Sequence, residues 1–240
     1  MSVYRIKPLP LLVARLDMGI FTYRANYGQK IDVPFYSWLI EGSKQKILVD
    51  TGISAADLRH FRGFECTEIQ SFEQALAKNN LRPEDIDIVI QTHLHYDHSW
   101  NTEKCVNARV VVQEEELKFA LAPHPIMWEL YARDKLARLR YKIVKGDQEL
   151  VPGISVISAP GHSPGSQAVA INTDKGVAVI SGFCSTFDTF KVPEHSNQLV
   201  QCPGTHSDPI KGYDSAVKIK CMADILIPQH DPIFMQNEYV

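Results

Sequence analysis

Residues 93–98 read HLHYDH, a cluster of polar side chains that a folded chain must bring to one place. The stretch holds three of the nine histidines in 240 residues, and chance would give it on the order of one time in a thousand. Packing four polar side chains together is costly unless an ion or hydrogen bonds satisfy them. Neutral imidazole and carboxylate groups are common zinc ligands, so the stretch predicts a metal site.

The spacing inside this stretch indicates how its side chains divide between ions. His93 and His95 are two residues apart, so an extended segment points both in the same direction and they can bind one metal. Asp97 and His98 come after the chain begins to turn and can face a second ion close by.

Other candidate ligands also follow strand-like runs. Asp50 follows ILV, His93 follows a β-branched run, His162 follows ISVISAPG and His230 follows ILIPQ. In an α/β fold, loops at one edge of a sheet carry ligands, because the strands hold them rigidly while solvent reaches them. These four ends therefore offer Asp or His to a single site.

Short β-rich runs alternate with helical patterns. We predict strands at 35–40, 47–49, 86–90, 109–112, 154–157, 168–171, 177–180 and 225–227. Ser71 is a predicted N-cap of a helix that the Arg82-Pro83 step ends, and residues 126–143 have apolar side chains at helical spacing. The pattern predicts a layered α/β sandwich, and the length favours one domain, residues 1–240.

Composition narrows the partners and the compartment. A net charge of −3 gives no general attraction to nucleic acid or to an anionic membrane. Five scattered cysteines without a C-x-x-C pair favour a reducing compartment. We read no signal peptide and no apolar run near the ~20 residues of a membrane span. We expect a cytoplasmic protein with a small-molecule substrate, no nucleic-acid or membrane partner, and a homodimer left open.

Five stretches resemble the metallo-β-lactamase superfamily, in particular its N-acyl-homoserine-lactone lactonase-like branch. They are LVDTG (48–52), THLHYDH (92–98), VVQEEE (111–116), APGHSPGS (159–166) and PQHDP (228–232). The resemblance implies an αββα sandwich of two mixed sheets flanked by helices, with a metal centre between the sheet edges. It implies that one metal is held by His93, His95 and His162, and the second by Asp97, His98 and His230. Asp50 would orient a ligand histidine.

The sequence departs from this family at two positions. The family's bridging aspartate falls on Phe183 or Cys184, depending on a one-residue shift. If Cys184 occupies it, a thiolate becomes a metal ligand, and Phe187 replaces the tyrosine that contacts the substrate carbonyl in the lactonases. The alternative for Cys184 is a small buried apolar side chain.

The resemblance implies a hydrolase in which a metal-bound hydroxide cleaves a small carbonyl substrate, with a lactone or an ester favoured. Asp97 would relay a proton to the leaving oxygen. We expect one or two zinc ions, with manganese or iron as alternatives, and no organic cofactor. Other candidates are a thioesterase or amide hydrolase, a metal-binding oxidoreductase and a non-catalytic binding protein.

We assign substrate selection to residues 117–145, predicted as a helical insertion near the active site. Trp128 and Tyr131 are expected to line an apolar pocket with Phe187. The alternative is that this helix packs its apolar face on the core.

Overall fold

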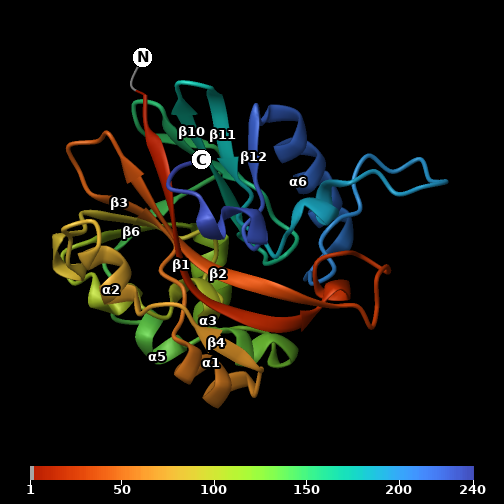
Figure 1. Cartoon of the computed structure of the whole chain (residues 1–240), viewed down its shortest axis with the longest axis horizontal. Coiled ribbons are helices and arrows are strands. Elements are labelled where there is room, and N and C mark those ends of the chain that lie inside the picture. The colour runs from red at the N-terminus through yellow and green to blue at the C-terminus, as the bar shows by residue number, and fades with distance from the viewer. Residues whose placement is uncertain (1–2) are drawn as a thin grey trace.

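The computed structural model describes residues 3–240, which form two β-sheets packed face to face with helices outside both (Figure 1). The first sheet has the order β4-β1-β2-β3-β5-β6-β7, with β1 (Arg5–Asp17), β2 (Lys30–Glu41), β3 (Ile47–Val49), β4 (Cys66–Glu68), β5 (Ile88–Ile90), β6 (Arg109–Gln113) and β7 (Tyr141–Val144). The second has the order β12-β11-β10-β9-β8, with β8 (Gln148–Val151), β9 (Ile154–Ser158), β10 (Gln167–Thr173), β11 (Gly176–Ile180) and β12 (Ile225–Ile227). The α-helices are α1 (Ala55–Arg62), α2 (Phe72–Ala77), α3 (Tyr96–Ser99), α4 (Glu114–Leu121), α5 (Arg133–Leu136) and α6 (Pro209–Met222).

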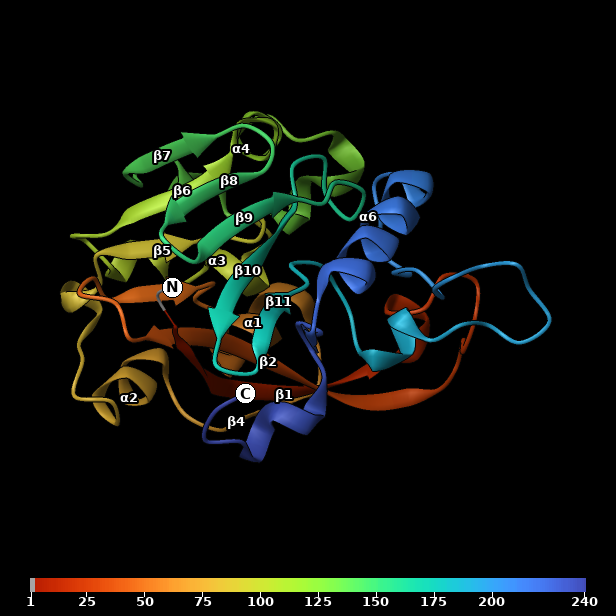
Figure 2. The same ribbon diagram turned by 90° about the horizontal axis from the view of Figure 1, so that it is seen from above.

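Both sheets are mixed, which confirms the predicted sandwich. In the first sheet β1, β2 and β3 are antiparallel, whereas β3, β5, β6 and β7 run parallel. In the second, β12 is parallel to β11 and the other pairs are antiparallel. Figure 2 shows the second sheet lying across the first. Because β3 and β5 are parallel neighbours, their C-terminal ends meet at the same edge.

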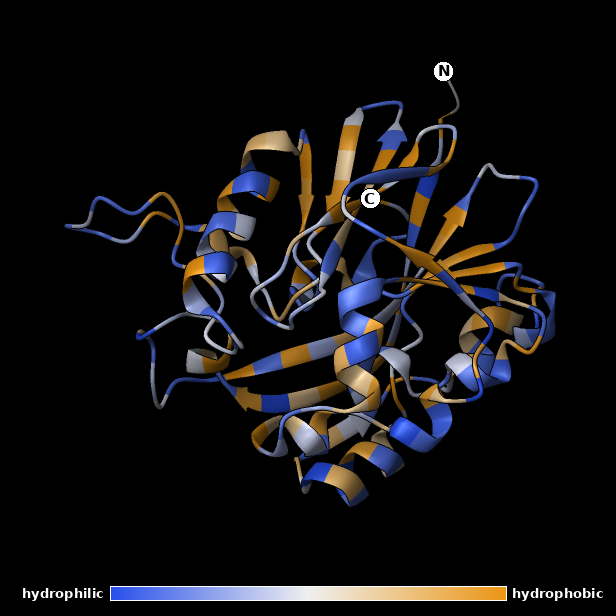
Figure 3. Ribbon diagram, turned by 180° about the vertical axis from the view of Figure 1, so that it is seen from behind, coloured by the Kyte–Doolittle hydropathy of each residue, from blue (hydrophilic) through white to orange (hydrophobic). Residues whose placement is uncertain are grey.

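The main hydrophobic core lies between the sheets. Trp38 and Ile90 of the first sheet belong to one buried cluster with Val156 and Ile180 of the second. The strands are accordingly rich in hydrophobic residues (Figure 3). Helix α2 covers the outer face of the first sheet and α6 that of the second, each completing a further buried cluster. Burying both faces of each sheet gives a rigid frame for the loops at its edge.

Strand β1 was not predicted, because Pro8 and Pro10 interrupt its apolar run. A proline is tolerated in a strand where no neighbour needs its missing N–H group. Strand β4 pairs with β1 only at Leu12 to Ala14, so the side of β1 opposite β2 has no strand partner at the two prolines. The Pro10 carbonyl on that side accepts from the Gln70 side chain at 2.9 Å instead.

The prediction of one helix over residues 126–143 is wrong. The segment contains a 3-10 helix (Pro125–Leu130) and the single turn of α5, and then enters the sheet as β7. Backbone pairing with β6 overrides the helical spacing, and Ile143 stays half exposed on this edge strand. Among residues 3–240, no helix has both the length and the apolar character needed to cross a membrane.

Candidate metal centre

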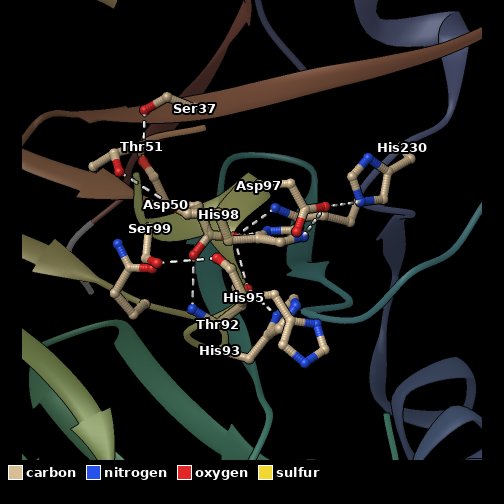
Figure 4. Close-up of polar contacts among 12 residues, drawn as sticks. Ser37, Asp50, Thr51, Thr92, His93, His95, Asp97, His98, Ser99 and His230 are labelled. Atoms are coloured by element: carbon tan, nitrogen blue, oxygen red, sulfur yellow. Dashed lines mark hydrogen bonds and ion pairs between the residues drawn. The ribbon is translucent and has the colours of Figure 1, made fainter. Parts of the chain in front are cut away.

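Four strand ends from distant parts of the sequence meet at one edge of the sandwich (Figure 4). Asp50 follows β3, and the stretch 93–98 follows β5. His162 follows β9 and His230 follows β12 of the second sheet. The fold therefore brings together the polar residues that the sequence places at separate strand ends.

A first group consists of His93, His95 and His162. Their donor atoms lie within 4.8 Å of one another, and all three side chains are buried. The Nε2 atoms of His93 and His162 are 3.2 Å apart. His93 and His95 project from the same extended segment, as the two-residue spacing predicts.

A second group lies directly beside the first. The donor atoms of His93, Asp97 and His98 also fall within 4.8 Å of one another, so His93 belongs to both groups. Asp97 Oδ2 is 3.3 Å from His98 Nε2 and 4.0 Å from His230 Nε2, and Figure 4 shows this carboxylate between the two rings. Two adjacent sets of donors are thus available in one place.

Asp50 holds His98 of the second group in position by contacting the ring nitrogen that faces away from the cluster. Its carboxylate is fully buried and accepts hydrogen bonds from Thr92 N at 2.8 Å, Thr92 Oγ1 at 2.7 Å and Gln229 Nε2 at 2.7 Å. It lies 2.8 Å from His98 Nδ1, so it fixes the ring with Nε2 toward the cluster. Asp50 has a φ of 55°, a backbone conformation that these bonds stabilise.

Two other rings are fixed in the same way by main-chain carbonyls. His162 Nδ1 donates to Thr205 O at 2.7 Å, and His230 Nδ1 donates to Pro34 O at 3.0 Å. A neutral imidazole that donates from Nδ1 keeps a lone pair on Nε2. These rings therefore present metal-binding nitrogens to the cluster.

The hydrogen bonding of the ring nitrogens tests whether a metal fits the cluster. The Nε2 atoms of His95 and His230 are buried, and no group among residues 3–240 is hydrogen-bonded to them. His98 Nε2 is buried too and has only the Asp97 carboxylate beside it, 3.3 Å away. Unpaired buried polar atoms are unfavourable, and a cation coordinated by them would remove that cost. The donor set and its orphaned atoms fit a metal ion.

Burial keeps most of the histidines neutral. Burial lowers the pKa of His93 and of His95 well below the ordinary value, and neighbouring histidines add to the effect. Burial lowers the pKa of His162 and of His230 to about 4. A neutral ring is the form that binds a metal, so no proton competes at neutral pH.

Asp97 and His98 behave differently because each charge stabilises the other. Burial opposes ionisation of both, but their attraction outweighs it. The pKa of Asp97 lies well below its usual range, and Asp97 with Asp50 raises the pKa of His98 to about 10. The two carboxylates thus favour positive charge at this position, which a bound cation would also supply.

Glu116 is a buried residue whose role the sequence did not suggest beyond its place in the VVQEEE stretch. Its Oε1 accepts from Leu94 N at 2.9 Å, within the hexapeptide. Its Oε2 accepts from Ser163 Oγ at 2.6 Å and Gly165 N at 3.1 Å, within the loop that carries His162. Glu116 therefore joins the two loops that supply the first group.

A cavity of about 120 Å³ opens onto the cluster. Its polar lining includes His95, Asp97, His162, His230, Tyr96 and Cys184, and its apolar lining includes Leu16, Ile20, Phe21, Phe35, Phe64 and Leu130. Phe183 points elsewhere and packs against Phe190, with ring centroids 5.8 Å apart. Of the two residues at the position of the missing aspartate, Cys184 is the one at the cavity.

Two of the three residues expected to line the substrate pocket lie in a second cavity beside the cluster. Trp128 and Tyr131 line a neighbouring cavity of about 400 Å³, although the Tyr131 ring lies 5.0 Å from that of His95. Phe187 packs beside Phe234, with centroids 6.1 Å apart, and its N–H donates to Asp231.

Two mixed sheets with a buried histidine–aspartate cluster at their edge define a class of metal-dependent hydrolases. A family model described as the metallo-beta-lactamase superfamily matches residues 33–182, and the chain belongs to that superfamily. The resemblance drawn from the sequence motifs is confirmed.

Characterised relatives agree with this assignment. The N-acyl homoserine lactonase AiiA of Bacillus thuringiensis subsp. kurstaki is 30% identical over 191 residues, which cover 75% of each chain. An N-acyl homoserine lactonase of Bacillus sp is 27% identical over 252 residues, covering 99% of this chain and 94% of the relative. The chain is an enzyme, a metal-dependent hydrolase of lactonase- or esterase-like type.

Solved structures match over the whole length. A B. thuringiensis AiiA mutant with N-decanoyl-L-homoserine bound at the active site has a TM-score of 0.80 and 26% identity, covering 100% of both chains. An N-acyl homoserine lactone hydrolase with N-hexanoyl-L-homoserine bound at the catalytic metal center gives the same values. In these neighbours a small molecule is bound at the active site, in the second case at the metal centre.

Proposed function

We propose that this enzyme opens the lactone ring of N-acyl homoserine lactones at a centre that holds two zinc ions. The observation that carries the proposal is the buried cluster, in which histidines of three chain segments come together and the buried Nε2 atoms of His95 and His230 have no hydrogen-bond partner among residues 3–240. The lactonases that resemble the chain over most of its length support the substrate class.

The proposed ligands are the two groups of the cluster. His93, His95 and His162 would hold one ion, and Asp97, His98 and His230 the other. Cys184 would serve as the shared ligand in place of a bridging aspartate, a proposal supported by its place on the cavity wall. Nitrogen, carboxylate and thiolate donors favour zinc over manganese or iron.

When bound, the ions acidify a water molecule and polarise the substrate carbonyl. In the overall reaction the water oxygen bonds to the carbonyl carbon, the ring C–O bond breaks, and a proton passes to the leaving oxygen. Asp97 would relay that proton, a role supported by its place in the cavity lining and by its distances of 3.3 Å to His98 Nε2 and 4.0 Å to His230 Nε2. Asp50 would keep the His98 ring in orientation throughout.

The cavity walls suit the remainder of such a substrate. The apolar part of the lining includes Leu16, Phe21, Phe35, Phe64 and Leu130. These apolar surfaces gain free energy when they cover an alkyl chain. A cavity of about 120 Å³ accommodates the reacting ring and leaves a long acyl chain to extend outward.

The test is hydrolysis of N-hexanoyl- and N-decanoyl-homoserine lactones by zinc-loaded protein. The rate is measured from the protons that the carboxylic acid product releases. We expect turnover that disappears after chelation and returns with zinc. Matched thioesters and amides define the alternatives. If the protein hydrolyses a thioester or an amide but no lactone, the proposal is wrong and the protein has that other hydrolase activity.

A further inference from the structure

One tyrosine on the wall of the metal-site cavity has a hydroxyl without a hydrogen-bond partner among residues 3–240. Tyr96 is 6% exposed and lines the same cavity as Asp97 and Cys184. Within the part of the chain that the structure describes, no group accepts a hydrogen bond from its hydroxyl or donates one to it. Unlike the sealed His95 Nε2, this hydroxyl keeps some access to solvent, so it is available to a molecule that enters the cavity.

The other buried tyrosines show that the chain otherwise satisfies such groups. Tyr4 donates to Pro152 O at 2.8 Å, and Tyr36 donates to Asp231 O at 2.9 Å. Tyr131 reaches Glu116 at 3.5 Å. Tyr96 is the exception among the buried tyrosines of residues 3–240, and it is the one on the wall of the metal-site cavity.

The packing of Tyr96 fixes its position. It begins α3, directly after His95, and its ring belongs to a buried hydrophobic cluster. The Phe61 ring lies 5.2 Å from it, and the Arg62 guanidinium lies 5.7 Å from its centroid. A ring held on several sides has little freedom, so its hydroxyl is a preorganised donor.

Phe187, at the position of the lactonase tyrosine, lacks such a donor. The resemblance to the lactonases implies a tyrosine where this chain has Phe187, and a phenyl ring cannot donate. Phe187 also packs beside Phe234 and does not line the cavity. A substrate carbonyl at the centre would therefore find no hydroxyl from that side.

We propose that Tyr96 is a catalytic residue whose hydroxyl donates a hydrogen bond to the carbonyl group of the substrate. The inference rests on the proposed function, since it takes a lactone or a related carbonyl compound as substrate. A phenol is protonated at neutral pH, so it stabilises the negative charge that develops on the carbonyl oxygen. The hydroxyl stays a donor throughout and transfers no proton.

The first experiment compares Tyr96→Phe with the wild type, both loaded with zinc. We expect kcat/KM to fall by about 10²–10³-fold, the usual effect of removing one such donor. Metal content should be unchanged. The thermal midpoint should not fall, because the lost hydroxyl has no hydrogen bond in the free protein.

Tyr141→Phe is the matched control. The Tyr141 hydroxyl donates to Leu136 O at 2.9 Å, and the residue does not line the cavity. This variant should lose thermal stability and keep its kcat/KM, the reverse of the pattern expected for Tyr96→Phe. The contrast separates a substrate contact from a structural role.

The second measurement is binding of N-hexanoyl-L-homoserine by calorimetry, which needs no turnover. We expect Tyr96→Phe to bind it about tenfold more weakly than the wild type. Product affinity and kcat/KM both within twofold of the wild type would overturn the inference, and so would loss of metal from the variant. A wild type without activity on any lactone would instead overturn the proposed function.

Discussion

The histidines of the centre are positioned by bonds made at the ring nitrogen that faces away from it. Asp50 lies 2.8 Å from His98 Nδ1, and main-chain carbonyls accept from His162 and His230. Each bond fixes both the orientation and the tautomer of a ring. Substitution of a side chain that holds a ligand ring, such as Asp50, should therefore weaken metal binding although every ligand is still present.

At a ligand itself the effect should be larger. We expect His93→Ala or His162→Ala to remove metal and activity together, because each takes a nitrogen from the group within 4.8 Å. His60→Ala, on the exposed side of α1, is the control and should keep its metal. Elemental analysis of purified protein measures this, and a fully loaded His162→Ala protein would refute the ligand assignment.

Cys184 distinguishes a sulfur ligand from a packing residue. We expect Cys184→Ser to lose metal and turnover and Cys184→Asp to recover both, because a carboxylate restores an anionic ligand. Metal content and kcat are measured for the two variants side by side. A serine variant with unchanged metal and rate would leave Cys184 as a small buried side chain.

Among the secondary-structure elements, predictions from residues close together in the sequence were more reliable than predictions for segments whose structure depends on pairing with a distant strand. The capping box of Ser71 and Gln74 starts α2 as predicted, because it depends on residues three apart. Residues 141–144 form a strand because they pair with β6, about thirty residues earlier, so the helical spacing of their apolar side chains gave a wrong prediction. The hexapeptide lies after β5 as predicted, whereas the contacts of Glu116 and the cavity wall depend on folding of distant loops.

The end of one element, α4, holds the two metal loops together through Glu116. We expect Glu116→Gln to weaken zinc binding by about 10–100-fold. A glutamine has one oxygen, so its NH₂ group must face the N–H of either Leu94 or Gly165, and one loop has to move. Competition with a chelator measures the affinity, and the absorption spectrum of cobalt-loaded protein reports the changed geometry.

The control for this variant lies on the same helix. Glu115→Gln makes the same chemical change at a side chain that is 67% exposed and whose one ion-pair partner among residues 3–240 is Lys118. It should leave zinc affinity and the cobalt spectrum unaltered. Equal affinities in the two variants would show that the loops hold their separation without Glu116.

For the whole molecule, metal binding and stability should be linked. A ligand that binds the folded state alone stabilises it by about 2.7 kcal/mol at a concentration 100 times its Kd. We expect chelation to lower the thermal midpoint and zinc to restore it in a concentration-dependent way. If the thermal midpoint of the wild type does not change with zinc concentration, the folded chain does not form the proposed site.

The spacing of the centre along the chain has a consequence for biosynthesis. Its polar residues run from Asp50 to His230, and the last of them follows β12, near the end of the sequence. Chains begin to fold from the N-terminus while they are being made. The hexapeptide is therefore made long before its final neighbours, and the complete centre forms only after His230 has been made. The full ligand set is then available only to a chain that extends past β12, and a chain cut short before β12 would lack part of its binding site.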